Sequence, residues 1–171
     1  HALMHVRSRA PTLVWPKLSR GHLHEAEVNS AFVAKLHLAL DGLPTFTGLD
    51  QAGGRIILAE SMRAIEDAFD RAKYGEFAEQ LPMEVIVPTV HDPSLAPEGG
   101  DAFYVLSPVP NLAGDTDWEQ QAEPYRQAVE RYLADTVMPD LPQHVATSRL
   151  LTPLDFRHRL NSVMGAAFGL A

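Results

Sequence analysis

Two short stretches of the chain combine residues whose types could do chemistry. His22 and His24 stand close to Glu25, and imidazole and carboxylate groups are common zinc ligands. No His-Glu-x-x-His helix accompanies them, so we favour a surface pair of histidines over a metal site. His91 lies beside Asp92, whose carboxylate could raise the basicity of the imidazole. No nucleophile stands with them, and we favour a structural role in which Asp92 caps the amides of a turn.

The turns that bind nucleotide phosphates or expose a nucleophile are missing from the sequence. A dinucleotide site needs Gly-x-Gly-x-x-Gly between a strand and a helix, so that backbone amides reach the pyrophosphate. Gly53 and Gly54 instead precede a predicted strand, where a hairpin turn is the better interpretation. Ser94, Ser107 and Ser162 lack the Gly-x-Ser-x-Gly context of an exposed nucleophile. We therefore assign no catalytic, cofactor-binding or metal-binding residue.

Composition places the 171-residue chain among ordinary globular proteins, with 46% hydrophobic and 21% charged residues. A net charge of -8 disfavours nucleic acid as a partner. Cysteine is absent, which is compatible with a reducing cytoplasm, and no apolar run approaches the roughly 20 residues that span a bilayer. Four Lys or Arg residues precede the first acidic residue, Glu25. We interpret residues 1–24 as an arm, a linker or a cloning remnant, with a transit peptide or an anionic-membrane contact as the alternative.

Hydrophobic periodicity predicts an α+β fold. Alternation over residues 32–40 puts three leucines on one side of a strand and Lys35 and His37 on the other. In chain order we expect a strand over 32–40, a strand over 55–59, a helix between Ser61 and Gly75, two antiparallel strands within 83–110, a helix with Pro124 in its first turn, a strand over 145–151, and a short helix from Pro153 through Leu160. These elements indicate a largely antiparallel or mixed sheet with helices on one face. We expect four aromatic residues in the core: Phe69, Phe103, Tyr104 and Trp118.

Several sequence motifs then narrow the interpretation. Residues 92–110 read Asp-Pro-Ser-Leu-Ala-Pro-Glu-Gly-Gly-Asp-Ala-Phe-Tyr-Val-Leu-Ser-Pro-Val-Pro. Further motifs follow the same order at residues 35–44, 68–75, 138–141 and 151–156. Together they closely resemble the bacterial phytoene desaturases and their relatives, the phytoene-dehydrogenase-like flavin oxidoreductases. The resemblance covers the chain from about residue 32 to its end.

The resemblance carries expectations about domain organisation. In that family an FAD-binding Rossmann-like domain is built from both ends of the chain, and a substrate domain is inserted between them. Residues 25–171 are therefore expected to form a single substrate-binding-type domain, similar to that of amine-oxidase-like flavoenzymes and truncated at its C-terminus. Gly100 stands where carotenoid desaturases usually have Cys, and Asn111 where they usually have His. These departures make flavoenzyme ancestry a firmer inference than carotenoid activity.

The resemblance also implies a function. We expect the substrate-binding segment of an FAD-dependent desaturase or dehydrogenase that acts on a long apolar, isoprenoid or carotenoid-like substrate. FAD would belong to the full-length parent, and the chain alone would bind none and be inactive. We predict that the substrate cavity includes His37, Phe103, Val105 and Phe168. The alternative is a non-enzymatic lipid- or protein-binding module that has lost its cofactor domain.

Expected partners follow from the same interpretation. They are an apolar small molecule, the missing FAD-binding domain and a second copy of the chain, because the missing domain would leave apolar surface exposed. We expect a cytoplasmic location, in peripheral contact with a membrane, and no nucleic acid.

Overall fold

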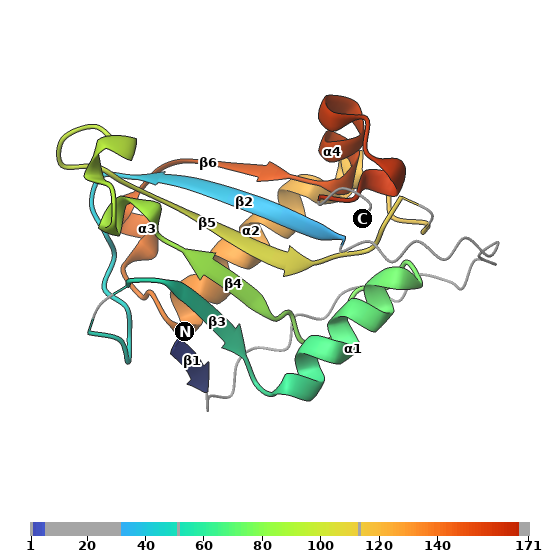
Figure 1. The fold of residues 1–171 in the computed structure, drawn as a ribbon, viewed down its shortest axis with the longest axis horizontal. Coiled ribbons are helices and arrows are strands. Elements are labelled where there is room, and N and C mark those ends of the chain that lie inside the picture. The colour runs from blue at the N-terminus through green and yellow to red at the C-terminus, as the bar shows by residue number, and fades with distance from the viewer. Residues whose placement is uncertain (1, 6–31, 51, 113, 168–171) are drawn as a thin grey trace.

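The computed structural model describes residues 2–5, 32–50, 52–112 and 114–167 (Figure 1). His22, His24, Glu25 and Phe168 therefore lie outside the described residues. The elements are β1 (Ala2–His5), β2 (Val33–Leu40), β3 (Arg55–Ala59), α1 (Met62–Lys73), β4 (Met83–Ile86), β5 (Asp101–Pro108), α2 (Trp118–Thr136), α3 (Leu141–His144), β6 (Val145–Leu151) and α4 (Pro153–Leu160), with 3-10 turns at Pro88–Val90, Pro93–Leu95 and Val163–Gly165. Among the helices described, none is long and apolar enough to cross a membrane.

The strands form a mixed sheet in the order β1-β3-β4-β5-β2-β6 (Figure 1). From β3 to β6 every neighbouring pair is antiparallel, and only β1 runs parallel to its neighbour, β3. β4 and β5 are antiparallel neighbours, as expected for two strands joined by a connection too short for a crossover helix. The expected α+β class with a largely antiparallel sheet is confirmed.

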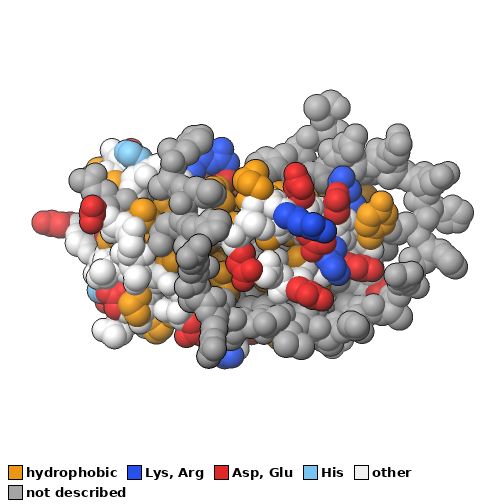
Figure 2. Space-filling model, turned by 90° about the horizontal axis from the view of Figure 1, so that it is seen from below, with side chains coloured by type: hydrophobic (Ala, Val, Ile, Leu, Met, Phe, Trp, Pro, Cys, Tyr) orange, Lys and Arg blue, Asp and Glu red, His pale blue; other side chains and the backbone are white. Residues whose placement is uncertain are grey.

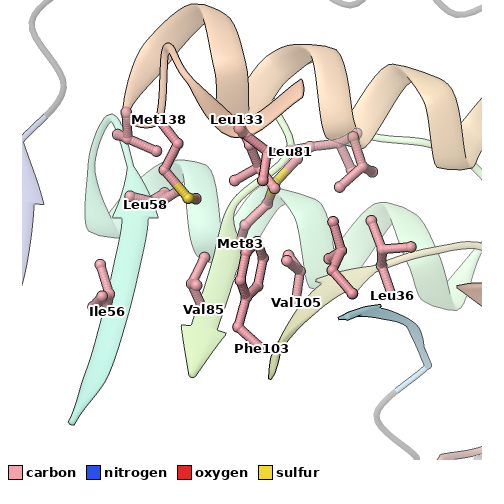
Figure 3. Close-up of a cluster of buried hydrophobic side chains, with 14 of the residues drawn as sticks. Leu36, Ile56, Leu58, Leu81, Met83, Val85, Phe103, Val105, Leu133 and Met138 are labelled. Atoms are coloured by element: carbon pink, nitrogen blue, oxygen red, sulfur yellow. The ribbon is translucent and has the colours of Figure 1, made fainter. Parts of the chain in front are cut away.

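One face of the sheet is packed against α2, and the hydrophobic core lies between them (Figure 3). Leu36, Val105 and Val85 stand side by side on neighbouring strands, and each is at most 1% exposed. Leu133 of α2 reaches this layer from above and is fully buried. Burying such side chains contributes about 1.5–3 kcal/mol each, so this face supplies much of the driving force for folding.

Aromatic side chains in the first half of α2 pack against Phe77, which precedes β4. The rings of Phe77, Trp118 and Tyr125 lie within 5.8–6.0 Å of one another, measured between centroids. The Tyr125 hydroxyl also forms a buried hydrogen bond of 2.5 Å with Ser107 of β5. The helix is thus tied to the sheet by both packing and a polar contact.

The beginning of α2 corrects one expectation. The helix starts at Trp118, because the Asp117 side chain accepts hydrogen bonds from the amides of Glu119 and Gln120. Pro124 therefore lies inside the helix rather than in its first turn. Proline lacks an amide hydrogen, so the carbonyl of Gln120 loses its usual helical partner there. The N-cap aspartate was the sequence signal that marked the earlier start.

α1 lies beyond the ends of β3 and β5 (Figure 1). Ser61 accepts a hydrogen bond from the amide of Ala64, and Gly75 follows the helix with φ of +74°, so both expected boundaries are confirmed. Lys and Arg side chains alternate with Asp and Glu on its outer surface (Figure 2), and Arg71 forms a 2.8 Å ion pair with Asp67.

Two of the four aromatic residues expected in the core lie elsewhere. Phe103 and Trp118 are buried, as predicted. Phe69 of α1 is 36% exposed, because the buried side of that helix is formed by small alanines. Tyr104 is half-buried on the face of the sheet opposite α2, since its neighbours in β5 occupy the core side.

Candidate functional site

The face of the sheet opposite α2 is the main candidate site, and we call it the open face. In Figure 1, α2 passes behind the sheet and no labelled helix crosses in front of it. Strand register places on it Arg55 and Ile57 of β3, Glu84 and Ile86 of β4, Ala102, Tyr104 and Leu106 of β5, Lys35, His37 and Ala39 of β2, and Thr147, Arg149 and Leu151 of β6. All of these side chains are half-buried or exposed. The open face is therefore a broad surface of mixed character.

An aromatic and cationic cluster lies on the β5, β2 and β6 side of the open face. His37 is the cross-strand partner of Tyr104 on one side and of Arg149 on the other. The His37 and Tyr104 rings lie 6.0 Å apart between centroids. Lys35 Nζ lies 4.1 Å from the centre of the Tyr104 ring, within the range of a cation–π contact. Three neighbouring strands thus bring an imidazole, a phenol and two cations together.

His37 is held as a neutral base by this environment. Partial burial lowers its pKa below the ordinary value of 6.5, and the nearby charges of Lys35 and Arg149 lower the pKa further. A neutral imidazole carries one donor and one acceptor nitrogen. At neutral pH His37 can therefore bind a polar group without adding charge to the surface.

A second charged contact on the open face joins β3 to β4. Arg55 forms a two-pronged ion pair with Glu84, with Nε–Oε1 at 3.0 Å and Nη2–Oε2 at 2.5 Å. These two charges compensate each other, and the pair raises the pKa of Arg55. Three cations and one carboxylate give the open face a net charge of about +2, whereas the whole chain carries -8. The excess positive charge of the open face comes from Lys35 and Arg149.

Apolar side chains surround the charged groups. Ile57, Ile86, Leu106 and Leu151 are all half-buried, and Leu106 and Leu151 flank Lys35 in the strand register. A surface of this kind can bind an elongated apolar molecule by contact, with polar groups to orient it.

The predicted cavity residues are not brought together by the fold. His37 lies on the open face, whereas Phe103 and Val105 lie under α2 and are each 1% exposed (Figure 3). Phe168 lies outside the described residues. Strand β5 is apolar on both sides, so alternation alone did not indicate which of its residues face the core. Tyr104 and Leu106 are the β5 residues that join His37 on the open face, and sequence reasoning missed them.

His91 and Asp92, in the connection between β4 and β5, have structural roles. Asp92 Oδ1 accepts hydrogen bonds from the amide and the hydroxyl of Ser94, at 3.1 and 2.6 Å, which confirms the capping role. His91 Nε2 accepts a bond of 3.3 Å from the amide of Gly54 and so connects two loops. Within the described ranges there is no group of three or more His, Asp or Glu side chains that could hold a metal ion.

The two short strand-to-helix junctions, β3–α1 and β6–α4, do not fit a flavin pyrophosphate. β3 leads into α1 through Glu60 and Ser61, and β6 leads into α4 through Thr152, without a glycine at either junction. The side chains of Ser61 and Thr152 already accept hydrogen bonds from the first-turn amides of Ala64 and Asp155. Those amides are the groups that a phosphate would need at such a junction.

Comparison with known proteins shows which sequences this chain resembles. No family model matches the chain. It is 40% identical over 108 residues to the neurosporene-forming phytoene desaturase of Rhodobacter capsulatus, covering 62% of this chain and 20% of that protein. It is 40% identical over 94 residues to the lycopene-forming phytoene desaturase of Pantoea ananas, covering 54% and 19%. It is 34% identical over 121 residues to the 4,4'-diaponeurosporene-forming 4,4'-diapophytoene desaturase of Staphylococcus aureus, covering 67% and 23%.

Over more than half of its length, the α+β chain is therefore similar in sequence to desaturases. More narrowly, it is similar to the phytoene desaturases, so the resemblance inferred from its motifs is confirmed. The chain spans about a fifth of the length of the curated relatives it matches.

Proposed function

We propose that this chain is the substrate-binding segment of an FAD-dependent oxidoreductase of the desaturase or dehydrogenase type. Its substrate is a long apolar molecule of the isoprenoid class, which lies on the open face. The similarity to phytoene and 4,4'-diapophytoene desaturases over 54–67% of the chain is the observation that carries this proposal.

The structure supports a binding role rather than a chemical one. The open face has a half-buried apolar surface that a hydrocarbon chain can cover, and Tyr104 offers an aromatic ring for contact with double bonds. Bound flavin in the longer protein would accept the hydride, while these residues hold and orient the substrate. The isolated chain is accordingly inactive.

Flavin retention tests the proposal that this segment binds no FAD by itself. The chain is incubated with FAD and passed through a gel-filtration column, and the absorbance of flavin is compared with that of protein. We expect no retained flavin. The full-length Rhodobacter capsulatus desaturase, treated in the same way, serves as a reference for the assay. Stoichiometric flavin in the protein peak would contradict the assignment of this chain as a cofactor-free segment.

Binding of a neutral polyene tests the proposal that the open face holds a long apolar substrate. Retinol serves as the probe, because its fluorescence reports transfer from water to an apolar site. Replacing Ile86 and Leu106 by Gln should weaken binding about tenfold, a loss of about 1.4 kcal/mol. The control is Val90→Gln, which changes an exposed apolar residue away from the open face. Equal effects of the two changes, or no binding to the unaltered chain, would contradict the proposed site.

A further inference from the structure

Two positive charges of the open face lack a negative partner among the described residues. Arg55 is neutralised by Glu84, but no ion pair joins Lys35 or Arg149 to a carboxylate in the described part of the chain. Lys35 contacts the ring of Tyr104, and the register places Arg149 on the other side of His37. The two cations therefore lie beside one histidine, Lys35 on the same strand and Arg149 on the neighbouring edge strand β6.

A fully apolar occupant would leave these two charges in a poor environment. Covering the open face with hydrocarbon removes water from Lys35 and Arg149, and an unpaired charge that loses its water is strongly disfavoured. An occupant with its own negative group would replace the lost water with charge-assisted hydrogen bonds. The apolar neighbours of Lys35 in the register, Leu106 and Leu151, would meanwhile contact the rest of the molecule.

We propose that the open face binds a single long apolar molecule that ends in a carboxylate, with Lys35 and Arg149 holding the carboxylate and the apolar side chains holding the chain. This inference rests on the proposed function and specifies the chemical class of its substrate. The observation that carries it is the combination of two uncompensated cations with half-buried apolar residues on one face of an otherwise acidic protein.

His37 provides a spectroscopic reporter for this site. Burial and the positive charges of Lys35 and Arg149 lower its pKa in the free protein, and Tyr104 is its remaining neighbour on the third strand. A bound carboxylate cancels part of that positive charge, so binding must raise the pKa of His37. A neutral ligand of the same shape cannot produce this rise.

The experiment compares retinoic acid with retinol, which share one polyene chain and differ in the terminal group. We expect the unaltered chain to bind retinoic acid at least about tenfold more tightly than retinol. Replacing Lys35 and Arg149 by Met keeps the apolar stems and should abolish the difference. Arg63→Met, on exposed α1, is the matched control and should preserve it. A proton NMR titration of His37 with and without retinoic acid supplies a second readout in the unaltered protein.

The outcomes separate this inference from the proposed function. Equal binding of the two retinoids, or an unchanged pKa of His37, overturns the carboxylate inference and leaves the apolar site standing. Failure to bind either retinoid overturns both. Phosphatidylglycerol vesicles, compared with phosphatidylcholine vesicles, test a membrane surface as the occupant. Recruitment to the anionic vesicles that depends on Lys35 and Arg149, without a preference for retinoic acid, also overturns the inference.

Discussion

At Thr152 three hydrogen bonds close the junction between β6 and α4. The amide and hydroxyl of Thr152 both donate to Asp155 Oδ2 at 2.9 Å, and the amide of Asp155 donates to Thr152 Oγ1 at 3.3 Å. Pro153 occupies the first helical position, where its missing amide hydrogen costs nothing. The helix has the bounds expected from the sequence, Pro153 through Leu160, because capping depends on residues close in sequence.

Replacing Thr152 by Ala should lower the free energy of unfolding by about 1 kcal/mol, since the change removes the hydroxyl that caps α4. Chemical denaturation monitored by circular dichroism measures the loss. Thr152→Ser keeps the hydroxyl and serves as the control, so it should be milder. If both variants lose the same stability, the cap is not the source of the effect.

The ionised carboxylate of Glu123 stabilises the folded protein, and acid removes this stabilisation. Its hydrogen bonds, first from Arg126 and then from Gln127, lower the pKa of Glu123 to about 2. The pKa in the folded state lies below the unfolded value of about 4.3, so the stabilisation is full above that value. It is lost as the pH falls from there towards 2.

The pH dependence of the melting temperature tests this term. Glu123→Gln removes the ionisable group, so the unaltered protein should exceed the variant in melting temperature above about pH 5, with a gap that closes towards pH 2. Glu66→Gln on the exposed side of α1 is the control. A gap that stays constant from pH 6 to pH 2 would show that the ionised carboxylate contributes nothing.

Among the elements, α2 and β5 are joined by the buried Ser107–Tyr125 hydrogen bond of 2.5 Å. Burial raises the pKa of Tyr125, so the phenol stays protonated and either hydroxyl can donate. Tyr125→Phe should cost about 1–2 kcal/mol, because it leaves the Ser107 hydroxyl buried without this partner. Unfolding measurements on the two single variants and the double variant Ser107→Ala/Tyr125→Phe give the coupling. The double variant should cost less than the sum of the singles, and strict additivity would contradict the coupling.

Element order was predictable because each element carries a local signal. The strands over 55–59 and 145–151 have the predicted bounds, and Ser61 and Gly75 delimit α1 as expected. The start of α2 differs from the expectation because proline is a common first-turn residue, whereas the helix is capped by Asp117, seven residues before Pro124. Parallel pairing of β1 with β3 joins residues far apart in sequence, which no local pattern encodes.

For the molecule as a whole, the decisive feature is a sheet with one face packed and the other open. The sequence indicated this asymmetry for β2, where leucines alternate with Lys35 and His37. It did not do so for β5, where both sides are apolar, and so Phe103 and Val105 were placed in a cavity although they lie in the packed core. The candidate site therefore depends on strand register, which only the three-dimensional structure supplied.

Methyl NMR can locate a bound ligand on one face of the sheet, because different Ile, Leu and Val residues lie on the two faces. The chain is labelled at the Ile, Leu and Val methyl groups and titrated with retinol. We expect shifts for Ile86, Leu106 and Leu151 on the open face, and none for Val105 and Leu133 in the core under α2. Shifts confined to the core methyl groups, or no shifts at all, would contradict the assignment of the open face as the substrate-binding surface.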